Sequence, residues 1–318
     1  MTRIFGHDAI FDSFARAQAS GRLHHGWILA GPRGVGKAGF AAEAARMLVD
    51  PENRYPSMVA HRTHPDIIWV QRLPKEAPKE GEDPDPDAEL KRSIAIDQIR
   101  AVQHSLTTRP SMGPNRVVII DAADDLERGG ANALLKSLEE PPVGTYFILV
   151  SHASDRLLPT IRSRCQLLRF EPLDDDAMRQ ALVQALPQAA AAEIDALVRS
   201  GRGLPGQAMM LAGLDFGAIE AITDDIVRSG DPTNSLRHKL AETLSTKNAQ
   251  ASYEAFLRFV PARIAAIARS MDVANAAGAV DAFHQADRLA ARAIGLTLDK
   301  QAVLLQMGTL LAGLQKRG

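Results

Sequence analysis

The segment from residue 31 to residue 38 has the composition of a loop that binds phosphate groups. Its residues are Gly31, Pro32, Arg33, Gly34, Val35, Gly36, Lys37 and Ala38. They match the pattern G-x-x-x-x-G-K, in which glycines let backbone N–H groups approach phosphate oxygens and the lysine reaches the terminal phosphates. The pattern continues with serine or threonine, whose hydroxyl binds Mg²⁺, but this chain has Ala38 there. The loop therefore predicts nucleotide binding without efficient turnover, and a glycine turn with no ligand is the alternative.

An acidic residue at the end of an apolar run is the second candidate element of this site. Four aliphatic residues at 117–120 precede Asp121. An aspartate at the carboxyl end of a buried strand can face the metal ion that accompanies a bound nucleotide. The sequence predicts that role for Asp121, and a strand-end carboxylate that is merely solvated is the alternative.

Strands that alternate with helices are needed to bring these residues together. Apolar runs predict strands at 27–30, 67–70, 117–120, 146–150 and 166–170, and helical spacing predicts helices at 10–20, 39–50, 96–106 and 131–139. This alternation indicates a parallel sheet with helices on both faces. We therefore expect an α/β P-loop domain over residues 1–171. Residues 73–89 are rich in proline and acid, which predicts a flexible surface insertion.

Strand signals end after Pro172, and alanine-rich amphipathic segments follow. Those at 174–186, 190–199 and 207–214 predict a three-helix unit, assigned to residues 172–215. Those at 216–229, 235–245, 249–271, 280–295 and 300–314 predict a larger all-α domain over residues 216–318. One apolar stripe there has helical spacing and is expected to need a partner surface, with an ordinary internal core as the alternative. Its members are Phe256, Val260, Ile264 and Ile267.

The overall charge is almost balanced, with 37 basic and 38 acidic side chains. This balance argues against a protein that binds nucleic acid tightly by itself. The single cysteine, Cys165, excludes an internal disulfide and a thiolate cluster for zinc. His61 and His64 lie three residues apart without further ligands nearby, so no metal site is expected. The lack of a leader pattern and of a long apolar stretch predicts a cytoplasmic protein with no membrane partner.

Six short stretches form a pattern that is specific in combination. The two most diagnostic are ANALLKSLEEPP at 131–142 and IRSRC at 161–165. The others are IFGH at 4–7, GRLHHGW at 21–27, THPD at 63–66 and IDQIR at 96–100. Together they resemble the bacterial clamp-loader subunits of the gamma/tau and delta-prime types, which are AAA+ proteins. The resemblance extends over residues 1–210, while the C-terminal helices match only in size and helicity.

The resemblance implies a fold, partners and a further functional residue. It implies an AAA+ domain, a small helical lid and a C-terminal collar that mediates oligomerisation. It also implies assembly with the gamma/tau and delta subunits of DNA polymerase III, which load the sliding clamp onto primed DNA during replication. Arg164 of the S-R-C motif would then act as an arginine finger on the ATP of the neighbouring subunit, since a guanidinium can stabilise charge on phosphate oxygens. Pairing of Arg164 with a local carboxylate is the alternative, and Cys165 is expected to be a packing residue.

Three departures from the pattern of hydrolytic family members favour the delta-prime type. Ala38 lacks the metal-binding hydroxyl, and Ala122 stands where such members carry the glutamate that orients water. Gly206, in the G-L-P-G stretch at 203–206, stands where the motors carry an arginine that contacts the phosphates. The zinc-binding cysteines of many family members are also missing between the loop and T-H-P-D. We therefore expect ATP or ADP to be bound without hydrolysis and no zinc; the alternatives are an active gamma/tau-type ATPase motor and a self-sufficient DNA-binding protein.

Overall fold

The computed structural model describes residues 5–76, 90–212, 216–246, 249–295 and 298–315. The chain divides into two compact units, Met1–Ala208 and Met209–Gly318. The first unit contains a sheet, and the described elements of the second unit are helices. The predicted division at residues 171 and 215 is finer than this one and stays a prediction.

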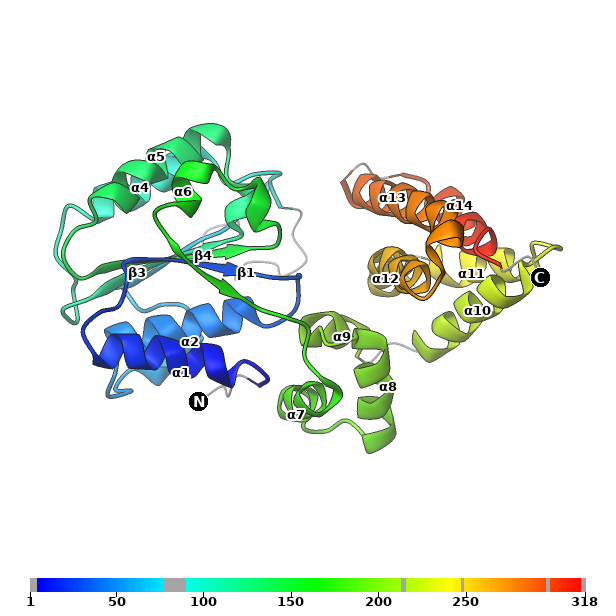
Figure 1. Ribbon diagram of the computed structural model, residues 1–318, viewed down its shortest axis with the longest axis horizontal. Helices are drawn as coiled ribbons and strands as arrows, with labels where there is room; N and C mark the ends of the chain where they lie inside the picture. The colour runs from blue at the N-terminus through cyan, green and yellow to red at the C-terminus, as the bar shows by residue number, and fades with distance from the viewer. Residues whose placement is uncertain (1–4, 77–89, 213–215, 247–248, 296–297, 316–318) are drawn as a thin grey trace. The chain divides into compact units, whose positions relative to one another are not determined.

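Five parallel strands form the sheet of the first unit (Figure 1). They are β1 (Gly26–Ala30), β2 (Ile67–Val70), β3 (Arg116–Asp121), β4 (Thr145–Ser151) and β5 (Gln166–Arg169). Their order is β2-β3-β4-β1-β5, and the register places Ile28 of β1 between Leu149 of β4 and Leu167 of β5. Each strand coincides with a predicted apolar run, so the parallel α/β architecture is confirmed.

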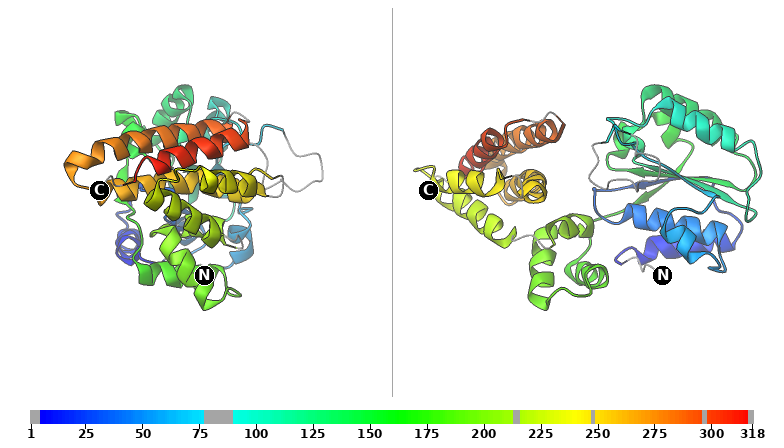
Figure 2. Two further views of the ribbon diagram at one scale, coloured as in Figure 1. Left: turned by 90° about the vertical axis from the view of Figure 1, so that its right-hand side faces the viewer. Right: turned by 180° about the vertical axis from the view of Figure 1, so that it is seen from behind.

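Helices cover both faces of this sheet (Figures 1 and 2). One face carries α1 (Asp8–Ala19) and α2 (Lys37–Val49), and the other carries α4 (Ile96–Ser105), α5 (Arg128–Glu139) and α6 (Pro159–Arg162). Ile28 packs in one core with Leu134, whereas Leu29 packs in the other core with Phe40. Successive side chains of a strand point to opposite faces, so an uninterrupted apolar run fits a sheet that is buried on both sides. The short elements are α3 (Pro56–Ala60), η1 (Ala123–Asp125) and η2 (Ser154–Arg156).

The described chain after β5 is helical. The first unit ends with α7 (Asp175–Ala185), α8 (Ala191–Gly201) and the start of α9 (Pro205–Leu211). The second unit contains α10 (Phe216–Ser229), α11 (Ser235–Leu244), α12 (Gln250–Arg269), α13 (Val273–Gly295) and α14 (Lys300–Ala312). The predicted helices are confirmed over the described residues, with two differences in their bounds. α9 spans Pro205–Leu211 rather than 207–214, of which residues 213 and 214 lie outside the described residues, and α13 begins at Val273 rather than at residue 280. Its alanine-rich first turns favour helix formation without supplying an apolar stripe.

The apolar stripe of α12 is internal core, which corrects the expectation that it needs a partner surface. Phe256, Val260 and Ile264 are 0% exposed, and Ile267 is half-buried. The stripe belongs to a helix that packs extensively against α13. Helical spacing alone could not decide between the two alternatives, because a core and an interface both require an apolar face.

A buried ion pair anchors the loop between α4 and β3. Asp66, from the T-H-P-D stretch, is 0% exposed, and Arg116 at the start of β3 is 5% exposed. The Asp66 carboxylate accepts hydrogen bonds from Ser111 N and Met112 N, each at 2.7 Å, and lies 3.3 Å from Arg116 Nη2. Arg116 also donates to two carbonyl oxygens of the same loop. The Asp66–Arg116 pair therefore holds the loop between α4 and β3 against the start of β3.

The predicted surface insertion at 73–89 begins and ends at neighbouring positions. Lys91 N donates a hydrogen bond to Leu73 O at 2.7 Å, and Pro74 pairs with Leu90. Residues 77–89 themselves lie outside the described part of the chain.

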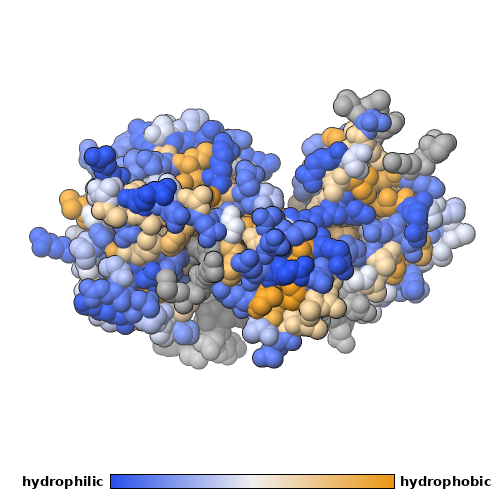
Figure 3. Space-filling view, turned by 60° about the horizontal axis from the view of Figure 1, so that its bottom comes forward, coloured by the Kyte–Doolittle hydropathy of each residue, from blue (hydrophilic) through white to orange (hydrophobic). Residues whose placement is uncertain are grey.

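Hydrophobic residues are scattered in small groups among hydrophilic ones on the face that Figure 3 shows. Among the helices of the described residues, none combines the length and the apolar character needed to cross a membrane.

Candidate functional site

The predicted phosphate loop joins β1 to α2. Gly31 directly follows β1, and Lys37 is the first residue of α2. Glycine is required at position 31, because a Cβ atom there would lie 2.2 Å from the carbonyl oxygen of Phe170. Gly36 adopts a φ of +108° and has open space around it. Position 36 is therefore uncrowded at the start of α2, where free N–H groups can receive an anion.

Lys37 is folded back onto its own loop. Its Nζ atom donates to Gly31 O at 2.6 Å and to Pro32 O at 2.7 Å, and the residue is 3% exposed. Burial lowers the pKa of Lys37 to about 8, while the carboxylates of Asp121 and Asp124 oppose the shift. A bound phosphate group would have to compete with the two carbonyls for this ammonium group.

Two further donors bind carbonyl oxygens of the loop. Gly206 N, in the first turn of α9, donates to Gly34 O at 2.8 Å, and His7 Nε2 lies 3.3 Å from Val35 O. The approach of Gly206 is so close that a Cβ atom there would lie 2.9 Å from Gly34 Cα. An arginine at position 206 does not fit this arrangement, which gives a structural reason for the missing phosphate-contacting side chain.

We expect Gly206→Ala to lower the free energy of unfolding of the first unit by about 1–3 kcal/mol, the usual cost of overpacking. The added methyl group would push α9 away from the loop. Gly39→Ala in α2 is the matched control, because nothing lies within 4 Å of its Cβ position and alanine favours a helix over glycine by about 0.5–1 kcal/mol. Urea unfolding followed by tryptophan fluorescence measures both, since Trp27 and Trp69 lie in the first unit. Equal stabilisation by the two substitutions would contradict the close contact.

Asp121 lies at the carboxyl end of β3, as predicted. Burial raises the pKa of its carboxyl group, and the nearby cations of Arg62, Arg33 and Lys37 oppose this shift. The next residue, Ala122, is 4% exposed and offers only a methyl group. The site thus has a carboxylate near the lysine but no group at position 122 that could orient water.

The two acids that follow in η1 make other contacts. Asp124 accepts hydrogen bonds from Ser151 Oγ at 2.9 Å and from His152 N at 2.6 Å. Asp125 pairs with Arg72 at 3.1 Å. Both carboxylates are thus engaged in contacts of their own, and Asp124 also lies near enough to Lys37 to oppose the lowering of its pKa.

His152 is a residue of this site that the sequence motifs did not indicate. Its Nδ1 atom is buried without a hydrogen-bond partner among the described residues. Burial lowers the pKa of His152 to about 4, and the positive charges of Lys37 and Arg33 add to that shift. β3 and β4 are neighbours in the sheet, so the residues after their carboxyl ends lie close together, where open α/β sheets bind ligands. Applying this strand-end rule to β4 would have found the residue.

The residues around the loop fit a nucleotide phosphate group in part. The loop glycines, the start of α2 and Lys37 provide N–H and ammonium donors. Ala38 provides no oxygen ligand for Mg²⁺, a cation that is held by oxygen atoms. In the described ranges, no group of three or more His, Cys, Asp or Glu side chains converges as a metal site would require. The arrangement suits anion binding better than phosphoryl transfer.

Arg164 lies between α6 and β5 with its side chain 34% exposed. Its Nη2 atom pairs with Glu139 Oε1 at 2.7 Å, and its Nη1 atom donates to Thr160 O at 2.9 Å. In the chain by itself, Arg164 therefore pairs with a local carboxylate, which is the alternative to the arginine-finger role. Cys165 packs against the core, and burial raises the pKa of its thiol to about 12, which fits the expected packing role.

The loop and Arg164 lie at opposite ends of β1. Gly31 follows the carboxyl end of the strand, whereas a Cβ atom at its first residue, Gly26, would lie 3.1 Å from Arg164 O. At a rise of about 3.3 Å per residue, β1 separates its two ends by roughly 13 Å. Arg164 and its partner Glu139 therefore lie at the amino end of β1, the length of a strand from the loop of the same chain.

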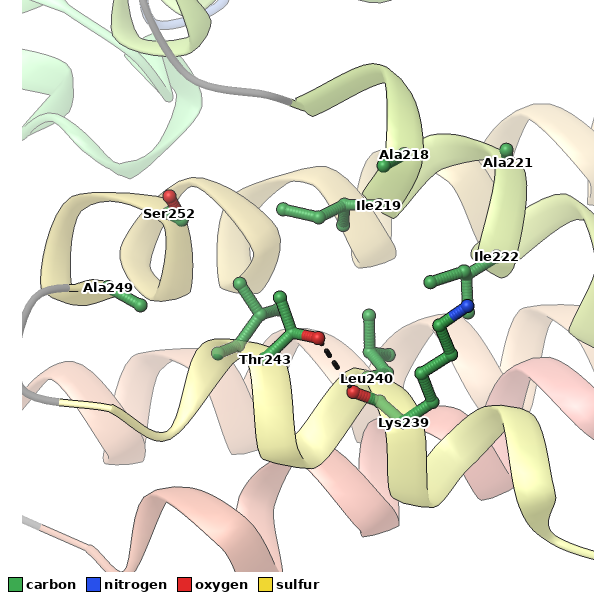
Figure 4. Close-up of a pocket in the computed structure, with 10 residues that line it drawn as sticks. Ala218, Ile219, Ala221, Ile222, Lys239, Leu240, Thr243, Ala249 and Ser252 are labelled. Carbon is green, nitrogen blue, oxygen red and sulfur yellow. Dashed lines mark hydrogen bonds between the residues drawn. The ribbon is translucent and has the colours of Figure 1, made fainter.

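The second unit contains an apolar groove of about 440 Å³ between α10, α11 and the start of α12 (Figure 4). Ile219, Ile222 and Leu240 line it, together with the charged residue Lys239. The carbonyl of Lys239 accepts a hydrogen bond from Thr243 Oγ1 at 2.8 Å. Among the described residues that line the groove, Lys239 is the one titratable residue, so the groove offers little for acid–base or nucleophilic chemistry.

Comparison with known proteins finds matches among subunits of DNA polymerase III. A family model described as "DNA polymerase III, delta subunit" matches residues 6–174. Relatives named DNA polymerase III subunit delta' are 29–33% identical. The one from Pseudomonas aeruginosa is 33% identical over 208 residues, which are 62% of this chain and 59% of the relative. DNA polymerase III subunit gamma from Buchnera aphidicola is 30% identical over 174 residues, which are 55% of this chain and 46% of that protein.

Among solved structures, a DNA polymerase III gamma subunit-related protein from Thermotoga maritima is similar with a TM-score of 0.49 and 16% identity. The similarity covers 94% of this chain and 98% of the other.

Proposed function

The chain belongs to the family described as DNA polymerase III, delta subunit, and from this membership we propose that it acts as a delta-prime-type subunit of a bacterial clamp loader. An AAA+ P-loop domain followed by a helical lid and an all-α C-terminal part fits that role. In the proposal, its own site holds ATP or ADP without hydrolysing it. Its Arg164 acts as an arginine finger on the ATP of the neighbouring subunit, so that the chain serves DNA polymerase III without being an autonomous ATPase.

The observation that carries this proposal is the separation of Arg164 from its own loop by the length of β1. A partly exposed guanidinium that lies a strand's length from its own phosphate site can stabilise a phosphate group on another molecule. Its own loop, with Ala38 and Ala122 nearby, lacks the groups for hydrolysis. The arginine is therefore useful only beside a subunit whose hydroxyl and glutamate are intact.

The proposed partners are the gamma/tau and delta subunits, with the sliding clamp and primed DNA in the assembled complex and a cytoplasmic location. The matched region spans 59% of the Pseudomonas relative, so the role of the whole chain is part of the proposal. Residues 1–171, 172–215 and 216–318 are proposed as the AAA+ domain, the lid and the oligomerising collar. The α12 stripe does not supply the collar contact, because it is buried.

The other two candidate functions have less support. A gamma/tau-type motor is favoured by the similarity to a gamma subunit, but Ala38, Ala122 and Gly206 each remove a different part of the hydrolytic machinery. A self-sufficient DNA-binding protein would neutralise many phosphates with basic side chains, and the balance of 37 basic and 38 acidic residues does not favour it.

The purified chain should show no significant Mg²⁺-dependent ATP turnover, and Ala38→Ser should not restore it. The new hydroxyl could bind the metal ion, but Ala122 still could not orient water and Gly206 would still contact the loop. Phosphate release measures turnover, with a gamma/tau subunit as the positive control and calorimetric titration of ATP to detect binding. Substantial hydrolysis by Ala38→Ser would show that the role assigned to position 122 is wrong.

A further inference from the structure

Three segments that are distant in the sequence converge around Arg164. His25 Nε2 lies 2.9 Å from the carbonyl oxygen of Leu138, near the end of α5. A Cβ atom at Gly26 would lie 3.0 Å from Cys165 Sγ and 3.1 Å from Arg164 O, so glycine allows a close approach of β1 to this segment. The start of β1, the end of α5 and the S-R-C segment therefore form one platform that carries the arginine.

Contacts hold the guanidinium group on this platform at two of its nitrogen atoms. Nη1 donates to Thr160 O at 2.9 Å and lies 3.3 Å from Ser163 Oγ, while Nη2 lies 2.7 Å from Glu139 Oε1. These bonds leave further N–H donors of the guanidinium group for a phosphate oxygen. With 34% of its surface exposed, the side chain is accessible to a ligand of another molecule.

The stability of α5 does not explain why a glutamate stands at position 139. Glu139 is the last residue of α5, where the negative end of the helix dipole disfavours a carboxylate. The side chain of Glu139, which pairs with Arg164, is 49% exposed. Such exposed ion pairs contribute little to the free energy of unfolding. The placement is more readily explained by what the carboxylate does to the arginine.

We infer that Glu139 is a positioning residue that holds the guanidinium group of Arg164 ready for the phosphate group of the neighbouring subunit. The inference rests on the proposed function, because it concerns the same arginine. A long side chain that is held in advance loses less conformational entropy when it binds its target. Glu139 contacts the arginine rather than the phosphate, so its effect on ATP hydrolysis passes through Arg164.

A double-mutant cycle on Glu139 and Arg164 in the reconstituted loader tests this inference. We expect Glu139→Gln to lower stimulated ATP hydrolysis at the adjoining site about two- to fivefold, the range for loss of an exposed ion pair, with an unchanged KM for ATP. The kcat of the whole loader falls by less, because its other active sites are unaffected. Glu139→Asp keeps the charge and should retain more activity than Glu139→Gln. In the Arg164→Ala background, Glu139→Gln should have no further effect, because the group it positions is gone.

Glu140→Gln is the matched control. Glu140 is the adjacent exposed carboxylate at the C-cap of α5, so its neutralisation relieves the helix dipole equally without touching the Arg164 pair, and it should leave the rate unchanged. Full activity of Glu139→Gln, or a loss that persists in the Arg164→Ala background, would overturn the positioning role alone. Full activity of an assembled Arg164→Ala complex would overturn the arginine finger and the positioning role together. Sizing of each complex establishes that the variants fold and assemble.

Discussion

Arg164→Ala should lower DNA- and clamp-stimulated ATP hydrolysis by the reconstituted loader and leave assembly intact. An arginine supplied across an interface contributes about 10³- to 10⁵-fold in rate in well-studied nucleotide hydrolases. The loss is confined to the adjoining site, so total hydrolysis by a complex with several active sites falls by less. Assembly should persist because the side chain is 34% exposed, and Ser163 and Cys165 keep the backbone of the segment in place.

Arg162→Ala is the matched control for this result. Arg162 is also exposed and pairs with Asp155 at 3.7 Å, so its removal costs a similar surface ion pair and should leave hydrolysis unchanged. Arg164→Lys should recover little, because an ammonium group lacks the planar, bidentate fork of a guanidinium. Phosphate release by complexes that carry each variant, with assembly checked by sizing, measures the effect. An assembled Arg164→Ala complex with full activity would mean that the arginine is structural.

Asp66→Ala should destabilise the first unit by about 3–5 kcal/mol, the cost of leaving one partner of a buried pair uncompensated. Arg116 is 5% exposed and would lose its carboxylate. The backbone N–H groups of Ser111 and Met112 would also lose their acceptor. Urea unfolding followed by tryptophan fluorescence reports on this unit, because the two tryptophans of the chain lie within it.

Asp97→Ala tests whether burial causes that loss. Asp97 pairs with Arg100 at 3.0 Å, and the two side chains are 82% and 65% exposed. Removal of an exposed pair costs about 1 kcal/mol or less. If Asp66→Ala and Asp97→Ala lowered the unfolding free energy equally, Asp66 would not be the anchor of the loop before β3.

Most of the secondary structure follows from local patterns in the sequence. The run at 67–70 coincides with β2, and the helix predicted at 216–229 coincides with α10. β5 also follows from its apolar run, yet Leu167 is 39% exposed. This exposure could not be predicted, because it arises from the position of β5 at the edge of the sheet, where it pairs with β1 alone.

The sequence by itself determined which chemical groups are missing from the candidate site. Ala38 has no hydroxyl and Ala122 no carboxylate in any fold, because these properties depend on residue type alone. The order of glycines and lysine in the loop likewise predicts part of its local shape, and Lys37 Nζ indeed bonds to the carbonyl oxygens of Gly31 and Pro32 within the loop.

Only the tertiary structure decided how these groups are used. Gly206 packs against the phosphate loop, and Arg164 pairs with Glu139 at the other end of β1. It also decided that the α12 stripe is core rather than interface. These contacts join atoms that are distant in the chain. Local residue spacing cannot predict them, because it is the same whether an apolar or charged side chain contacts its own chain or another molecule.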